Sequence, residues 1–389
     1  MPSSRSFRKW SLSTFALVAA CAAPVASRAQ ATGGPDEKTE FLRLCDLAVP
    51  ELNKEITPFV NHDDVDPKTH HVPFFEDSYA VRALAVAYDL TGRREYIEAC
   101  QHWCDRVLTY QEQMIPKGAF YLNYGRRPGQ DKGDWWVADS GSVGMGVLAT
   151  EVRTRDPGLK RKYLDSLRTF ARLVIDNYVK EDGGVTDGLW SVYEGSWWCS
   201  TATFGSVLHL LAIETNDAEY RRIAQRAFQW TIAHDFREAT PISFHENPAG
   251  VVFYTFEFYA AAMPLVEPGT REHELATAQV AAAAQWWAEN QRGRGGKSSL
   301  DYLRNATYMG GMPYLMYALA RQLPPQRDLA KEADSELRYL AGLLLKNGDP
   351  PLSKIYAWEL MTWTMVSYAE KLSPGALYRS SSERISPER

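Results

Sequence analysis

Two kinds of helical segment alternate along the chain, and they differ in how hydrophobic and polar positions are spaced. The first kind is apolar on most faces and rich in Ala, Gly and aromatic residues, which is typical of a helix buried on all sides. The second kind has one apolar stripe and one charged face, which is typical of a helix that covers a core. The buried kind is expected to begin near Asp77, Asp139, Cys199, Val251, Thr307 and Ile355. The amphipathic kind is expected at 36–59, 94–113, 157–180, 217–234, 270–291 and 325–346.

The alternation repeats six times, and turn signals separate the members of each pair. These signals are Thr91-Gly92, Asp156-Pro157-Gly158, Asn216-Asp217, Pro268-Gly269 and Pro324-Pro325. Six buried helices need six amphipathic helices to cover their apolar backs, so the pattern predicts one all-α domain, an (α/α)6 toroid of six helical hairpins over residues 32–375. An open helical solenoid is the alternative, and six pairs with aromatic-rich entry loops favour a closed ring.

The first 31 residues are typical of an export signal. A basic start precedes the apolar run 12–23, and Ala29-Gln30-Ala31 fits a small-residue cleavage site. Val18-Ala19-Ala20-Cys21 also resembles a bacterial lipoprotein signal, in which Cys21 would carry a lipid anchor. We therefore expect a periplasmic or secreted protein, with an outer-membrane lipoprotein as the alternative. Residues 376–389 are expected to form a polar tail.

Charge and cysteine usage narrow the class of partner. The whole chain has a net charge of −5, and loss of the first 31 residues would remove four basic residues and no acid. An acidic chain argues against nucleic acid as a partner, although a local basic pocket could still bind an anionic sugar. The mature chain has four cysteines, Cys45, Cys100, Cys104 and Cys199, which are expected in the core without disulfides or a zinc site. No cofactor is expected.

Acidic residues stand at the junctions where each loop enters a buried helix. In a ring these junctions face one opening, so acids at neighbouring junctions would converge. Asp77 and Asp139 occupy equivalent places in adjacent repeats, which suits the pair of carboxyl groups that sugar hydrolysis needs. The alternative is that each is a helix N-cap, because each is followed by Ser.

Aromatic, basic and further polar residues near the same junctions are candidates for substrate binding. A sugar packs its C–H face on an aromatic ring, and in each adjacent Trp pair one ring is expected in the core and the other exposed. Arginine would suit a uronic-acid carboxylate, and histidine could bind hydroxyls or transfer protons; the alternatives are a solvated loop and structural histidines. The candidates are Trp135, Trp136, Trp190, Tyr193, Trp197, Trp198, Tyr308, Arg126, Arg127, His70, His71, His245 and Glu257.

The segment Trp136-Val137-Ala138-Asp139-Ser140, set in this repeat plan over about 36–372, resembles the six-hairpin glycosidases. Within them it resembles the unsaturated uronyl hydrolases of glycoside hydrolase families 88 and 105, although it has one residue more between Trp and Asp than their Trp-x-Asp segment. The resemblance implies an oligosaccharide substrate. It also implies that Asp139 protonates the double bond of a 4,5-unsaturated uronate, with Asp77 as the second acid.

Three other functions stay open from the residues alone. One is an exo-β-glucuronidase that acts on saturated glucuronides through an ordinary acid/base pair. Another is a polysaccharide lyase or uronyl epimerase on the same scaffold, which needs a Tyr or His base such as Tyr254, Tyr308, Tyr356 or His245. The last is a sugar-binding protein without catalysis.

Overall fold

The computed structural model describes residues 36–56, 69–70, 74–122, 135–188, 195–237, 248–263, 266–290, 312–321, 329–346 and 355–381. The inner helices are α2 (Phe74–Thr91), α4 (Val137–Arg153), α6 (Trp198–Thr215), α9 (Pro248–Ala262), α12 (Met312–Ala320) and α14 (Ile355–Leu372). The outer helices are α1 (Glu37–Leu52), α3 (Arg94–Gln111), α5 (Pro157–Asn177), α7 (Ala218–Ala233), α10 (Arg271–Asn290) and α13 (Leu329–Lys346). A short parallel strand pair, β1 (Glu55–Ile56) and β2 (Thr69–His70), and the 3-10 helix η3 (Ala376–Tyr378) accompany them.

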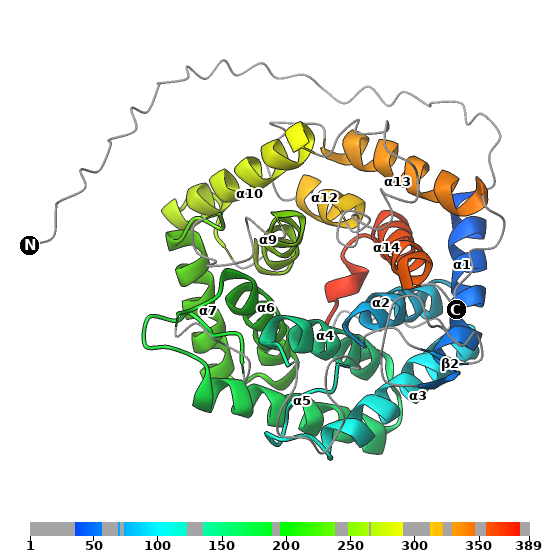
Figure 1. Cartoon of the computed structure of the whole chain (residues 1–389), viewed down its shortest axis with the longest axis horizontal. Coiled ribbons are helices and arrows are strands. Elements are labelled where there is room, and N and C mark those ends of the chain that lie inside the picture. The colour runs from blue at the N-terminus through cyan, green and yellow to red at the C-terminus, as the bar shows by residue number, and fades with distance from the viewer. Residues whose placement is uncertain are drawn as a thin grey trace, which may run out of the picture. The chain divides into compact units, whose positions relative to one another are not determined.

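The inner helices form a closed ring. Each contacts the next in the order α2, α4, α6, α9, α12 and α14, and α14 contacts α2 again. The outer helices surround this ring, and α1 packs against both α14 and α2, so the first and last helices meet (Figure 1). The expected all-α (α/α)6 toroid is confirmed, and the open solenoid is excluded because its first and last inner helices would not touch.

Local sequence explains why each inner helix stops and turns back into its outer partner. The chain leaves α2 through Gly92, whose φ of 70° is in the left-handed region that glycine adopts without strain. It leaves α6 through Asn216, with φ of 52°, and the next residue, Asp217, caps α7 by accepting from the N–H groups of Glu219 and Tyr220. Asp156 caps α5 in the same way, with Pro157 in its first turn. All of these turn and capping residues can be recognised from the local sequence alone.

Two glycines allow α4 to approach both of its neighbours closely. A Cβ atom on Gly141 would lie 2.6 Å from Cγ2 of Thr203 in α6. A Cβ atom on Gly146 would lie 3.0 Å from Cβ of Ser78 in α2 and 3.1 Å from the ring of Trp103 in α3. Gly141 and Gly146 therefore serve helix packing.

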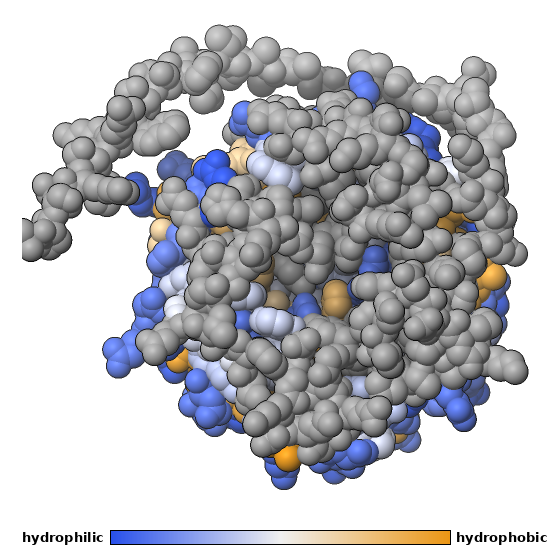
Figure 2. All heavy atoms as spheres, viewed as in Figure 1, coloured by the Kyte–Doolittle hydropathy of each residue, from blue (hydrophilic) through white to orange (hydrophobic). Residues whose placement is uncertain are grey.

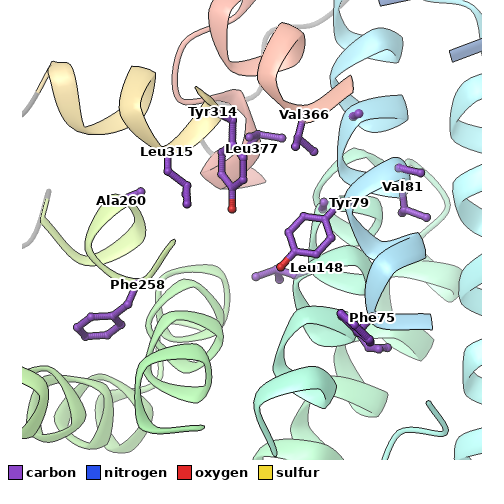
Figure 3. Packing of buried hydrophobic residues seen from close by; sticks show 14 of the residues in the cluster. Phe75, Tyr79, Val81, Leu148, Phe258, Ala260, Tyr314, Leu315, Val366 and Leu377 are labelled. Atoms are coloured by element: carbon purple, nitrogen blue, oxygen red, sulfur yellow. The ribbon is translucent and has the colours of Figure 1, made fainter. Parts of the chain in front are cut away.

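A buried ion pair crosses the middle of the ring. Arg82 of α2 donates to Oε1 of Glu257 at 3.0 Å, and α9, which carries Glu257, lies three places from α2 in the ring and therefore opposite to it. The hydroxyl groups of Tyr79 and Tyr314 also donate to this carboxylate, at 3.2 and 3.1 Å. Figure 3 shows both hydroxyls directed into the space between the inner helices.

Burial and mutual attraction determine the electrostatics of this pair. Burial alone lowers the pKa of a guanidinium, but the charge of Glu257 outweighs that effect and raises the pKa of Arg82 above its ordinary value. The side chains of Arg82 and Glu257 are 0% and 3% exposed. Glu257, which the sequence offered as a candidate for substrate binding, therefore lies buried at the ring axis with three described side chains bound to its carboxylate.

The C-terminal segment closes against the end of the ring where the inner helices finish. Arg153, at the end of α4, forms a buried ion pair with Asp89 of α2 at 2.7 Å and donates to the carbonyl oxygen of Ala376 at 2.8 Å. Ala376 and Leu377 are buried. The expected boundary between the domain and a polar tail at residue 376 is therefore too early in the chain, because η3 belongs to the packed domain.

The outward faces of the outer helices carry mostly hydrophilic residues, which surround the rim of the ring (Figure 2). The four cysteines of the described residues are buried and form no disulfide with one another, so their assignment to the core is confirmed. Among the described residues, no helix is long and apolar enough to cross a membrane. The export signal and Cys21 lie outside the described residues.

Replacing Arg82 by Met should lower the free energy of unfolding by about 3–5 kcal/mol, because the buried charge of Glu257 would lose the cation that it pairs with. Urea unfolding monitored by tryptophan fluorescence measures this loss. The control is Arg94→Met, which breaks an exposed ion pair with Glu98 and should change stability by less than about 0.5 kcal/mol. Equal losses in the two variants would contradict a special role for the central pair.

Candidate active site

Four consecutive inner helices bring their N-terminal ends to the same side of the ring. The indole N–H of Trp358 in α14 donates to Asp77 in α2 at 3.0 Å, which joins the first turns of these two helices. The rings of Trp136 and Trp197, which precede α4 and α6, stack with centroids 5.8 Å apart and an interplanar angle of 19°. Helix N-termini present unpaired N–H groups and the positive end of the helix dipole, so this side of the ring favours carboxylates.

Asp77 is fully buried in this arrangement. Its Oδ1 accepts from Trp358, and its Oδ2 accepts from the indole N–H of Trp103 at 3.3 Å. Asp77 is not an N-cap, since α2 begins three residues earlier at Phe74. Its side chain has no exposed surface, so of the two expected acids only Asp139 is partly exposed. Its carboxylate instead fixes two indole rings and adds negative charge beneath the opening.

Asp139 is the more accessible of the two expected acids. It is half-buried and lies in the first turn of α4, three residues after Trp136, so the two side chains lie on neighbouring parts of one helix face. Trp136 itself occupies the cap position and makes no side-chain cap bond, so the N-cap interpretation of Asp139 is wrong. Asp139 is thus partly exposed at the N-terminal end of α4.

A second carboxyl pair joins this cluster. Glu76 and Glu359 are 3% and 7% exposed; Glu76 lies in the first turn of α2, and Glu359 is the fifth residue of α14. Burial raises the pKa of Glu76, and so do the charge of Glu359 and a hydrogen bond between the two carboxyl groups. The charges of Asp77 and Asp139 raise the pKa of Glu76 further, which places all four acids in one electrostatic neighbourhood.

A hydrogen bond between two carboxyl groups requires that one of them keeps its proton. Glu76 therefore carries a proton at pH values where an exposed glutamate has lost it. Sequence reasoning did not select Glu76 or Glu359 for the site. The signal was present, because both lie at junctions that contain the other acids, but only packing shows that these junctions are adjacent in the ring.

The aromatic platform beside Asp139 consists of Trp136 and Trp197, which are both half-buried. Their chain neighbours Trp135 and Trp198 have no exposed surface. The structure agrees with the expectation that one ring of each pair is in the core. Trp135 and Trp198 are consequently packing residues, and Trp198 donates to the carbonyl oxygens of Thr231 and His234. Their expected part in substrate binding is corrected on this ground.

The side chains of the remaining candidates for substrate binding are not part of the described structure. His70 lies in β2 by its backbone. The others lie outside the described residues, and they are His71, Arg126, Arg127, Trp190, Tyr193, His245 and Tyr308. Within the described ranges, no group of three or more His, Cys, Asp or Glu side chains has the arrangement of a metal site.

The described site can hold a sugar against an aromatic surface and exchange a proton with it. Trp136 and Trp197 offer apolar faces, Asp139 offers a carboxyl group one helical turn away, and the buried acids below keep a proton in the cluster. Proton transfer by a carboxyl group of this kind is general acid–base catalysis.

Solved structures of similar shape include glycoside hydrolases. A possible member of glycoside hydrolase family 105 from Salmonella enterica has a TM-score of 0.59 and 12% identity, and the match covers 88% of this chain and 97% of that one. An unsaturated glucuronyl hydrolase from a Bacillus species has a TM-score of 0.56 and 11% identity, with 87% and 98% covered. A family 76 mannosidase from Bacteroides thetaiotaomicron has a TM-score of 0.54 and 11% identity, with 88% and 98% covered.

No protein-family model and no curated protein matches the sequence. At 11–12% identity the structural similarity establishes the fold. The chain thus has the (α/α)6 toroid of the six-hairpin glycosidases, and the resemblance that Trp136 to Ser140 indicated is confirmed at the level of the fold.

Glu76→Gln should change how stability depends on pH. Because its pKa is raised on folding, the folded protein binds this proton more tightly than the unfolded chain. The resulting stability is fully present below the ordinary pKa of 4.5 and is lost as pH rises through the raised value. The wild-type free energy of unfolding should therefore fall more steeply above pH ~5 than that of Glu76→Gln, by up to about 1.4 kcal/mol per pH unit.

Urea unfolding between pH 5 and 8 measures the two slopes. The matched control is Glu98→Gln on the exposed face of α3, whose slope should follow that of the wild type. Parallel curves for wild type and Glu76→Gln would show that Glu76 binds its proton equally in both states.

Proposed function

We propose that the chain is a glycoside hydrolase that acts on oligosaccharides containing uronic acid, with Asp139 as the proton donor. The observation that carries this proposal is the position of a half-buried carboxyl group one helical turn from a stacked pair of half-buried tryptophans, above three buried acids. The unsaturated glucuronyl hydrolase and the family 105 structure share the fold, which supports the substrate class.

The aromatic platform sets the orientation of the sugar. One face of a pyranose ring consists of C–H groups, which pack on Trp136 or Trp197 and leave the ring edge free. Since Asp139 follows Trp136 at a spacing of three residues, its carboxyl group lies beside the edge of a sugar on Trp136. Binding thus delivers the reacting atoms to the acid, which is the positioning part of catalysis.

We propose hydration of a 4,5-unsaturated uronate as the reaction. Asp139 donates its proton to C4 of the C4–C5 double bond, and positive charge develops at C5 and the ring oxygen. Water adds to C5, and its proton returns to the Asp139 carboxylate. The product is a hemiketal, which opens to a keto sugar and releases the leaving sugar as an alcohol. Buried negative charge nearby stabilises the cationic transition state.

Asp77 acts in this scheme as a positioning residue. Its contact with Trp358 holds the first turns of α2 and α14 together, its contact with Trp103 joins α2 to α3, and its charge is one of those that keep a proton on Glu76. Glu76 and Glu359 form a proton reservoir beneath Asp139. The alternative is a hydrolase for saturated glucuronides, which uses the same residues, with Asp139 protonating the glycosidic oxygen. The mannosidase structure of the same fold supports this alternative.

Asp139→Asn should lower turnover at least about 100-fold without changing the unfolding midpoint, because the amide cannot donate the acidic proton. The assay follows the ultraviolet absorbance of an unsaturated uronyl disaccharide, which disappears on hydration. Asp165→Asn, an exposed substitution on α5, is the matched control and should keep full activity.

A wild-type rate for Asp139→Asn would exclude Asp139 as the donor. Release of glucuronic acid from a saturated glucuronide, with no loss of absorbance from the unsaturated disaccharide, would favour the saturated-substrate alternative. A rise of absorbance from a uronic-acid polymer would instead indicate a lyase.

Trp136→Ala should raise KM about 5-fold with a smaller change in kcat, because stacking on an aromatic ring is worth about 1 kcal/mol and acts in the ground state. Initial rates over a range of substrate concentrations measure both constants. Tyr339→Ala removes an aromatic side chain from the outer helix α13 that is 41% exposed, and it should leave KM unchanged. An unchanged KM in Trp136→Ala would remove the platform from the substrate site.

A further inference from the structure

A separate cavity of about 370 Å³ lies between α6, α7 and the segment that leads into α10. Its size falls in the range of small-molecule sites, about 300–1,000 Å³. It is remote from the acids, because His209, which lines it, is the twelfth residue of α6, and about 16 Å of helix separates it from Trp198 at the mouth. The cavity therefore opens toward the opposite end of this hairpin.

The floor of the cavity combines apolar surface with one buried polar group. Phe228 is 8% exposed, and Val266 is half-buried. His209 is 6% exposed and makes no hydrogen bond to any described residue, although its ring lines the cavity. A buried polar group without a partner is costly unless something in the cavity binds it.

The charge state of His209 restricts what it can bind. Burial lowers the pKa of His209 to about 4, and the nearby charge of Arg221 lowers it too. The imidazole is therefore neutral at pH 7 and offers one donor and one acceptor nitrogen. A group with both functions matches a hydroxyl, which also donates and accepts.

The rim supplies more hydrogen-bonding groups of the same mixed kind. Gln225 and Gln229 are exposed at a spacing of four residues on α7, so their amides lie side by side at the edge of the cavity. Arg221 contributes one positive charge, while Glu267 and Glu272 contribute negative charges. Because both signs are present, the rim does not select an anion or a cation.

We infer that this cavity is a second carbohydrate site, which binds one neutral sugar unit. The sugar would place its C–H face on Phe228 and Val266, and its hydroxyls would bond to His209, Gln225 and Gln229. A purely apolar ligand would leave the buried imidazole without a partner, and an anion would meet the two glutamates. This inference is independent of the proposed reaction, since none of these residues lies at the mouth.

The probes for the experiment are maltotriose and cellotriose, titrated into the full-length protein and observed by saturation-transfer NMR and calorimetry. We expect at least one of them to bind with Kd on the order of 1 mM. The double variant Gln225→Leu/Gln229→Leu should weaken binding at least about 10-fold and leave hydrolytic activity unchanged. Both positions are exposed, so the variant keeps the core intact.

Two further variants make the result decisive. Gln113→Leu, an exposed glutamine of the turn after α3, is the matched control and should bind as the wild type does. His209→Phe retains apolar bulk and should weaken binding as the double variant does. If neither probe binds at a concentration 10-fold above the expected Kd, on the order of 10 mM, the inference is overturned. So would binding that survives the double variant but is lost in Trp136→Ala, since the sugar would then occupy the mouth.

Discussion

The buried contact between Arg82 and Glu257 is the constraint on which the rest of the toroid depends. A ring of six helices encloses an axis that no single helix can fill, and this protein fills it with a charged pair from opposite helices and two tyrosine hydroxyls. A buried pair of this kind contributes little net stability but makes each partner indispensable to the other. It therefore fixes how α2 and α9 face each other, and the remaining inner helices are placed between them.

Fixing α2 in the ring also fixes the chemistry at its N-terminal end. Arg82 lies five residues after Asp77, so the helix that the central pair holds is the helix that presents Glu76 and Asp77. Burial of several carboxyl groups together is unfavourable, and the protein offsets it with two indole donors on Asp77 and a retained proton on Glu76. The mouth is thus a strained electrostatic site held by a rigid scaffold, which is the usual condition of an active site.

The two ends of the ring differ in the residues that they carry. The end at which the inner helices begin concentrates acids and half-buried aromatic rings, while the end at which they finish is joined by Asp89, Arg153 and the C-terminal segment. The cavity beside His209 lies toward this second end, between hairpins rather than on the ring axis. A sugar bound there would leave the mouth free, so the two sites can be tested separately.

The sequence by itself determined the helices, their alternation and their number, since hydrophobic periodicity and turns such as Asn216-Asp217 are local signals. It also indicated that one tryptophan of each adjacent pair is buried, as Trp135 and Trp198 are. Only the tertiary structure decided that Asp77 is buried beneath the mouth, that Glu76 pairs with Glu359, and that Glu257 holds the ring axis. The physical reason is that the burial and pKa of a carboxyl group depend on its neighbours in space, and here those neighbours are as far apart in the chain as Asp77 and Trp358.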